Sequence, residues 1–154
     1  PNVMKGYLRI EQPGVLEPTR FGWHDTGDIV YQDEDGFLFI RGRAKRFAKI
    51  GGEMVSLTSV ESIAAELWAD GLNAAIACPC DKKGEQIILY GSNEHATRQV
   101  FIRHVREHGF SELHIPALVI APADIPVLGS GKIDYISLSK QHAQQSLKEP
   151  QPCT

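Results

Sequence analysis

Cysteine is scarce in this chain of 154 residues, which contains three. Cys78 and Cys80 flank a proline, and no second pair of Cys or His residues completes the spacing of a zinc site. Three cysteines predict structural thiols in a reducing compartment rather than a disulfide scaffold. The six histidines form no metal-binding or catalytic-triad pattern either. We therefore expect no metal site.

Long hydrophobic runs and an excess of positive charge are also missing. The longest apolar runs are far shorter than the roughly 20 residues of a membrane-spanning helix, and the first residues do not resemble a signal peptide. A net charge of −3 argues against a nucleic-acid partner. The content of 42% hydrophobic and 23% charged residues is typical of a globular protein. We expect a cytoplasmic protein and, because the chain does not begin with Met, a piece of a longer one.

Residues 1–44 have the pattern of the end of a larger β-rich domain. Runs rich in β-branched and aromatic residues at 29–32 and 37–41 flank the sequence D-E-D-G, a turn with glycine at its end. This pattern predicts a β-hairpin. Glycines and prolines divide the rest into loops and short strands without a core of its own. We therefore predict an incomplete remnant of a large N-terminal domain.

Residues 45–148 alternate short strands with amphipathic helices. Apolar residues at helical spacing from Val60 to Trp68 predict a helix that begins at a capping box formed by Thr58 and Glu61. A second helix is predicted at 96–108. This order predicts an α+β fold, a small domain with helices packed on a short sheet. The expected strands are 47–50, 54–56, 73–79, 86–91 and 117–121, followed by a short helix within 133–148 and a disordered tail at 149–154.

Five cations lie within nine residues, between Arg41 and Lys49. One interpretation is a solvated face or a nonspecific anion patch. With this patch the chain could also be a small nucleic-acid-binding protein. The other is a site for a phosphate-bearing ligand, because arginine offers a planar donor fork and lysine a compact charge. The adjoining glycines at 51–52 permit backbone turns and close approach of a ligand.

Asp28 and Lys132 are two further candidates for chemistry. A carboxylate such as Asp28 can accept hydrogen bonds from both hydroxyls of a ribose, although an Asx turn is the alternative. Lys132 lies in L-G-S-G-K-I-D, which departs from a phosphate-binding Walker loop at Pro126 and Ile133. We interpret this segment as a flexible stalk whose ammonium group can reach a carboxylate and a phosphate together and offset the charge that builds on their oxygens. The alternative is an ordinary exposed loop lysine.

Taken together, these motifs resemble the C-terminal part of the AMP-forming acyl-activating enzymes, the family of acyl-CoA synthetases, luciferases and peptide-synthetase adenylation domains. The motifs are D-T-G-D at 25–28, G-R-A-K-R-F-A-K-I-G-G-E at 42–53 and G-S-G-K at 129–132. The resemblance covers about residues 1–140 and depends on the joint order of short motifs. It implies a moving lid (45–148) that follows the end of a large domain (1–44).

The resemblance also implies a role for each matching position. Asp28 and Arg43 match residues that contact the ribose of ATP, and Lys45 matches the hinge about which the lid swings. Lys49 matches a lysine of the thioester-forming orientation, and Lys132 matches the lysine that catalyses adenylation. The loop that lines the pantetheine path is Gly51, Gly52 and Glu53.

The basic hinge segment K-R-F-A-K is most similar to a bacterial subfamily, the acyl-[acyl-carrier-protein] synthetase/lysophospholipid acyltransferases. That similarity implies ATP or AMP with Mg²⁺, a fatty acid, and an acyl carrier protein whose acidic surface Arg46 contacts. A CoA ligase lid and a free-standing carrier-protein or nucleotide-binding module are the alternatives. The ATP-phosphate loop and the acyl pocket of the family have no counterpart here, so we expect the chain alone to be inactive and to bind no Mg²⁺. The resemblance also implies inner-membrane association of the full-length enzyme.

Overall fold

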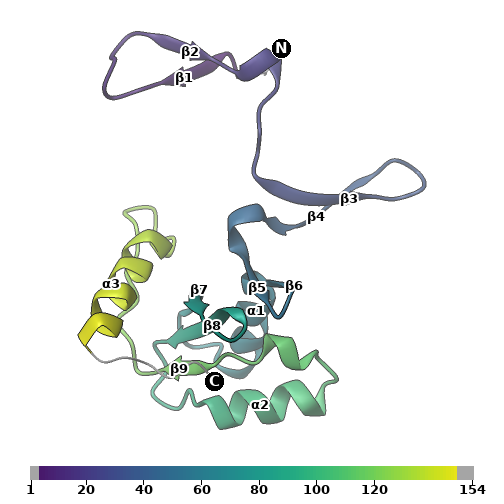
Figure 1. Ribbon diagram of the computed structural model, residues 1–154, viewed down its shortest axis with the longest axis vertical. Coiled ribbons are helices and arrows are strands. Elements are labelled where there is room, and N and C mark those ends of the chain that lie inside the picture. Colours follow the sequence, from purple (N-terminus) through teal and green to yellow (C-terminus); the bar gives the residue numbers. More distant parts are fainter. Residues whose placement is uncertain (1–3, 149–154) are drawn as a thin grey trace. The chain divides into compact units, whose positions relative to one another are not determined.

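The computed structural model describes residues 4–148, which form two compact units that divide between Ala44 and Lys45 (Figure 1). We call them the N-terminal unit and the C-terminal unit and describe each by itself. The predicted mixed α+β fold is confirmed. Within residues 4–148, no helix is both long enough and apolar enough to cross a bilayer. The predicted disordered tail at 149–154 lies outside the described residues.

Two separate antiparallel hairpins make up the N-terminal unit (Figure 1). The first pairs β1 (Gly6–Leu8) with β2 (Leu16–Pro18) and is followed by a 3-10 turn, η1 (Arg20–Gly22). It was not predicted, because three-residue strands carry too little alternation to be recognised. The second pairs β3 (Asp28–Gln32) with β4 (Leu38–Arg43), as predicted, and β4 extends two residues beyond the expected end.

The N-terminal unit lacks a core of its own. None of its residues whose burial the structure describes is buried. Large apolar side chains lie on its surface instead, among them Phe21, Trp23 and Ile40, which are 91%, 83% and 71% exposed. Isolated two-stranded hairpins are marginally stable in water, and this unit buries too little apolar area to compensate.

The C-terminal unit is built on a five-stranded sheet with the order β6-β5-β8-β7, in which β9 pairs with β8. β8 pairs with β7 along its whole length, and its other edge carries the end of β5 and, in parallel, β9. The elements are η2 (Ala44–Arg46), β5 (Phe47–Ile50), β6 (Glu53–Ser56), α1 (Leu57–Leu67), β7 (Asn73–Cys80), β8 (Gly84–Gly91), α2 (Arg98–Glu107), η3 (Glu112–His114), β9 (Leu118–Ile120) and α3 (Tyr135–Lys148).

Helices cover both faces of this sheet. Side chains alternate along β8, so Ile87 and Leu89 pack in the cluster that contains residues of α1 and α2, whereas Ile88 and Tyr90 pack in the cluster that contains Leu138 of α3. Figure 1 shows α3 in yellow and α2 in green, with strands between them. The two clusters make the core of the unit, and they fix α3 and the loop before it.

Two details of the helices differ from the prediction. The N-cap of α1 is Ser56 rather than Thr58, because the Ser56 hydroxyl accepts from the amide of Ser59 at 3.3 Å and Glu61 bonds elsewhere. α3 has 14 residues, longer than the short helix expected. Asp134 caps it by accepting from the amide and hydroxyl of Ser137, and these bonds lower the pKa of Asp134. Polar residues interrupt the apolar stripe of α3, which hid its length.

Candidate functional site

Asp28 and Arg43 form an ion pair across the β3–β4 hairpin. They are direct partners in the ladder, and Arg43 Nε lies 3.1 Å from Asp28 Oδ1. The Arg43 side chain is 70% exposed and the Asp28 side chain 21% exposed, so both keep unused hydrogen-bonding capacity toward solvent. A carboxylate acceptor beside a guanidinium donor fits a ligand with vicinal hydroxyls.

A bulge in the hairpin creates this pairing. Val30 pairs with Ile40, but the register shifts by one residue between Val30 and Ile29, so that Asp28 pairs with Arg43. Without the shift Asp28 would oppose Gly42, and the side chain of Arg43 would lie on the other face of the hairpin. The bulge therefore places the two charges on the same face.

An Asx turn lies in the loop before β3, but Asp28, the residue suggested for such a turn by the sequence, does not form it. The carboxylate of Asp25 accepts from the amide of Gly27 at 2.8 Å, and the hydroxyl of Thr26 accepts from the amide of Asp28 at 3.2 Å. The Asx turn is therefore made by Asp25, not by Asp28. Gly27 has a φ of 68°, in the left-handed region that glycine tolerates best. The Asp28 carboxylate remains available to Arg43.

Lys45, the predicted hinge, lies in the 3-10 turn η2 and is exposed. The residue before it is fixed, since the amide of Ala44 donates to the carbonyl of Gly27 at 2.7 Å. No salt bridge found among residues 4–148 includes Lys45. Its position is where the two units divide.

Lys49, Gly51, Gly52 and Glu53 lie together on the β5–β6 turn. The amide of Gly51 donates to the carbonyl of Lys83 at 2.9 Å, and the amide of Lys49 donates to a carboxylate oxygen of Glu85. Gly51 and Gly52 have φ values of 58° and 96°, which side chains rarely adopt. The tight turn accounts for both glycines and leaves Lys49 and Glu53 exposed beside them.

Lys132 lies in a closed turn, whereas the sequence was interpreted as a flexible stalk. Val127 and Ile133 form an antiparallel bridge, and within it the amide of Leu128 donates to the carbonyl of Lys132 at 2.7 Å. The amide of Gly131 donates back to Leu128 at 2.8 Å. We call residues 127–133 the Lys132 loop. Its backbone is held, whereas the ammonium group is exposed.

Apart from the hinge residue Lys45 in η2, the structure groups the predicted residues in three places. Asp28 and Arg43 meet in the N-terminal unit, the four residues of the β5–β6 turn meet in the C-terminal unit, and Lys132 lies on its own loop of that unit. Among residues 4–148, no cluster of three or more His, Cys, Asp or Glu could hold a metal ion.

Arg46 is where the sequence interpretation fails. It was expected to contact an acidic carrier protein, but its side chain is 16% exposed and pairs with Glu61 inside the C-terminal unit. The partners are 15 and more residues away along the chain, and no local signal announces them. Its Nη1 and Nη2 each donate to a group within the fold.

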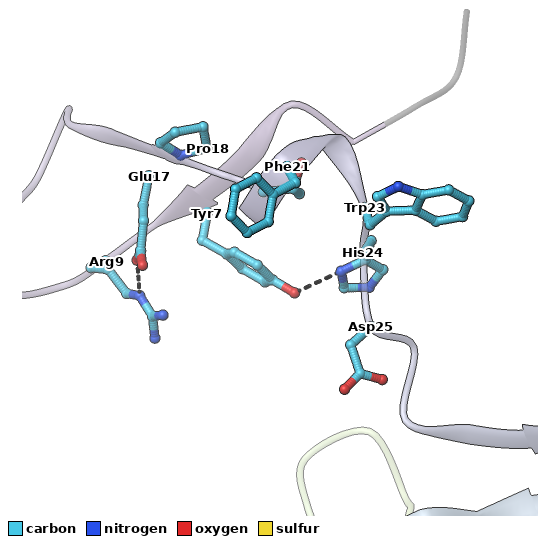
Figure 2. A pocket seen from close by; sticks show the side chains of 9 residues that line it. Tyr7, Arg9, Glu17, Pro18, Phe21, Trp23, His24 and Asp25 are labelled. Atoms are coloured by element: carbon cyan, nitrogen blue, oxygen red, sulfur yellow. Dashed lines mark hydrogen bonds and ion pairs between the residues drawn. The ribbon is translucent and has the colours of Figure 1, made fainter.

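A hollow of about 570 Å³ lies in the N-terminal unit. Figure 2 shows its polar pairs: Tyr7 Oη lies 3.0 Å from His24 Nδ1, and Arg9 Nε lies 2.7 Å from Glu17 Oε2. Its walls include the exposed ring of Phe21. No predicted site residue lines it, and its polar side chains include two pairs that bond to each other. Geometry alone assigns it no chemistry.

A smaller cleft of about 270 Å³ lies between α3 and the ends of β7 and β8. Burial raises the pKa of the Cys78 thiol to about 11, which makes it a poor nucleophile at neutral pH. Cys80 is disulfide-bonded, so the prediction of a free structural thiol is wrong for that residue. On the α3 side the buried His142 bonds through Nδ1 to Tyr90 Oη at 2.7 Å.

His142 should make stability depend on pH. Burial lowers its pKa below the ordinary 6.5. As the pH falls through about 6.5, His142 becomes protonated in the unfolded chain but stays neutral in the native state. The free energy of unfolding therefore decreases by at most about 1.4 kcal/mol per pH unit. Thermal melts between about pH 7.5 and pH 5.5 should show a smaller loss for His142→Gln than for the unmodified chain. The exposed His95→Gln control should keep the full loss.

The comparisons with known proteins identify the class of the fold. No family model matches the chain. A solved Mycobacterium tuberculosis fatty acyl CoA synthetase is 29% identical with a TM-score of 0.61, covering 80% of this chain and 25% of that one. The ATP-bound MatB of Rhodopseudomonas palustris, at 21% identity and a TM-score of 0.61 over 76% of this chain and 24% of its own, shares the fold. The fold is that of the C-terminal domain of adenylate-forming enzymes.

The curated relatives agree with this class. The chain is 29% identical over 144 residues to a 2-succinylbenzoate–CoA ligase of Listeria monocytogenes, which is 94% of this chain and 31% of that enzyme. It is 28% identical over 149 residues to a 2,3-dihydroxybenzoate-AMP ligase of Bacillus subtilis, or 96% of this chain and 28% of the relative. The homologues of this chain are thus AMP-forming CoA and acyl ligases. The chain spans under a third of the length of these relatives.

Proposed function

We propose that the chain is the C-terminal lid, with the last strands of the large domain, of an ATP-dependent fatty-acyl ligase. The specific form proposed is a cytoplasmic acyl-[acyl-carrier-protein] synthetase/2-acylglycerophosphoethanolamine acyltransferase. The observation that carries the ligase proposal is the Asp28–Arg43 pair at the end of a bulged hairpin, in a fold found at the C-terminus of adenylate-forming enzymes. The proposal is also supported by Lys132, which lies on a loop closed by hydrogen bonds and would supply a cation for the phosphate.

The first half-reaction joins the acid to AMP. An oxygen of the fatty-acid carboxylate attacks the α-phosphorus of ATP, and the bond to the leaving pyrophosphate breaks. Asp28 accepts hydrogen bonds from the ribose hydroxyls, and Arg43 donates to the same sugar. The ammonium of Lys132 stabilises the negative charge that builds on the carboxylate and α-phosphate oxygens. The substrate ATP carries Mg²⁺, for which the described residues supply no cluster of three ligands.

The second half-reaction transfers the acyl group to a thiol. The lid turns about Lys45, withdraws Lys132, and presents the β5–β6 turn with Gly51 and Gly52 to a phosphopantetheine arm. The thiol sulfur, once its proton is lost to solvent or a base, attacks the acyl carbon, and the bond to AMP breaks. Lys49 and Glu53 flank the turn that the arm passes.

The thiol acceptor of the second half-reaction is either an acyl carrier protein or CoA. Several relatives carry CoA in their names, and Arg46 is turned inward, which removes the basic contact first assigned to a carrier protein. Lys45 and Lys49 remain exposed in this segment and offer an acidic carrier protein two cations. An acyl-CoA synthetase is therefore the second candidate.

The isolated chain should be inactive in adenylation. ATP–pyrophosphate exchange with a long-chain fatty acid should stay at background, because the family's ATP-phosphate loop has no counterpart in the sequence. The enzyme that contains this chain should show fatty-acid-dependent exchange. A panel with 2-succinylbenzoate and 2,3-dihydroxybenzoate separates the acids in the names of the relatives from a fatty acid. Fatty-acid-dependent exchange by the chain alone would refute the lid proposal.

The acceptor is tested separately, with the acyl-adenylate formed first. Acyl transfer to holo-acyl carrier protein and to CoA is then followed by mass spectrometry. Transfer to the carrier protein supports the specific proposal. Transfer to CoA alone supports the second candidate and removes the carrier protein as partner.

A further inference from the structure

Arg46 follows the proposed hinge directly and is held inside the C-terminal unit. Its Nη1 donates to the carbonyl of Ala75 at 2.8 Å, and its Nη2 lies 2.5 Å from Glu61 Oε1. The guanidinium also lies over the ring of Tyr135, 3.8 Å from its centroid. We call Arg46, Glu61, Ala75 and Tyr135 the Arg46 clamp. It joins the hinge segment to α1, β7 and the start of α3.

The carboxylate of Glu61 is the centre of the clamp. Its Oε1 accepts from Arg46, from the amide of Ala75 at 2.8 Å and from the hydroxyl of Tyr135 at 3.0 Å. The side chain is 14% exposed. A charge this poorly hydrated depends on its donors, so displacing any one of them is costly. Burial, and then the charge of Glu61, raise the pKa of Tyr135 to about 12, so the phenol remains a donor at neutral pH.

The two residues between Lys132 and Tyr135 are held in place by hydrogen bonds and core contacts. Asp134 donates its amide to the carbonyl of Pro126 at 2.8 Å, which closes the base of the Lys132 loop. Ile133 bridges to Val127 and packs against the core cluster on the α3 side. Each residue between the clamp and Lys132 is thus tied to the body of the unit.

On the other side of the hinge the chain is tied to the N-terminal unit. Arg43 pairs with Asp28, and the amide of Ala44 donates to Gly27. Two arginines, Arg43 and Arg46, therefore hold the chain on either side of Lys45. The ties of Arg43 and Ala44 lie within one unit, and those of Arg46 lie within the other.

We infer that the Arg46 clamp positions the Lys132 loop: it confines a rotation at Lys45 to the backbone between Ala44 and Arg46, and it makes the loop follow Arg46 as one body. The inference rests on the proposed function for the rotation and for the role of Lys132. Arg46 and Tyr135 are positioning residues, because they act on the loop and touch no substrate.

The first test uses the chain itself and needs no activity. Amide hydrogen exchange is measured for Leu128 and Gly131, whose hydrogen bonds close the Lys132 loop, with Leu89 in the buried strand β8 as reference. The variants are Arg46→Lys, which loses the planar fork, and Tyr135→Phe, which loses the hydroxyl bond to Glu61 and keeps the ring. Both are conservative enough for the fold to persist.

Exchange of the two loop amides should accelerate about 10-fold in each variant, the effect of losing roughly one net hydrogen bond, with Leu89 much less affected. The exposed pair Arg106–Glu112 provides the control, and Arg106→Lys should leave the loop unchanged. The double variant should accelerate exchange by less than the product of the single effects, since both act through Glu61. Unchanged loop exchange, or an acceleration equal to that of Leu89, would overturn the inference.

The second test uses the enzyme that contains the chain. Arg46→Lys should slow adenylation by about 10²-fold, the order expected when a catalytic group is misplaced by about 1 Å, and leave the KM for ATP unchanged. Accelerated loop exchange with normal adenylation would support the clamp and refute the proposed role of Lys132. Slow adenylation in Arg46→Lys with unchanged loop exchange would refute the clamp, while ATP–pyrophosphate exchange still tests the proposed function.

Discussion

Replacing Lys132 with alanine should slow adenylation by about 10²–10³-fold and leave thioester formation nearly normal. The ammonium is exposed on a loop whose backbone is closed by hydrogen bonds, so the loop carries Lys132 at a defined place on the C-terminal unit. In the proposed adenylating orientation the ammonium stabilises the charge that develops on the carboxylate and α-phosphate oxygens. In the second half-reaction the proposed rotation has removed it from the reacting atoms.

Single-turnover kinetics separate these steps. One series starts from ATP and the fatty acid, and the other starts from preformed acyl-adenylate with the thiol acceptor. Lys132→Arg keeps the charge on a longer, planar group and should recover part of the rate. Lys82→Ala, an exposed lysine in the turn between β7 and β8, serves as the control and should change neither step. Equal losses in both series for Lys132→Ala would remove it from the proposed role.

The elements that the sequence predicts well are those whose pattern is local. The β3–β4 and β5–β6 hairpins follow from alternation around glycine turns, and the core face of α1 follows from apolar residues at helical spacing. The start of α1 was misplaced because Ser56 and Thr58 are both good caps, and the tertiary partners of Glu61 decide between them. A local sequence pattern cannot predict hydrogen bonds to residues that are distant in the sequence and become neighbours only in the folded chain.

The candidate site divides in the same way. The sequence predicts that Asp28 and Arg43 flank one hairpin, but their pairing depends on a bulge that shifts the register by one residue. Neither residue type nor spacing announces that shift. Arg46 shows the converse: five cations within nine residues suggest a single basic surface, whereas one of them pairs with a carboxylate 15 residues away. Charge counted along a sequence thus overstates the charge available to a partner.

Replacing Lys45 with proline in the enzyme should block thioester formation and let acyl-adenylate accumulate. Proline fixes φ near about −65° and also restricts Ala44 before it, so it stiffens the backbone where the clamp and the Asp28–Arg43 pair confine the rotation. A reacting thiol misplaced by about 1 Å costs on the order of 10²-fold in rate, and a lid that does not turn misplaces it further. Adenylation needs no such rotation and should continue.

Lys45→Ala is the matched control, because it removes the same charge and leaves the backbone free. If Lys45 acts only as an exposed cation, the alanine and proline variants should lose thioester formation equally. Proline can also destabilise η2, so a thermal melt and circular dichroism accompany the kinetics. A folded Lys45→Pro variant that loses both half-reactions together would contradict a selective hinge. Loss of the second half-reaction alone, with Lys45→Ala near normal, is the result that a rotation at this residue requires.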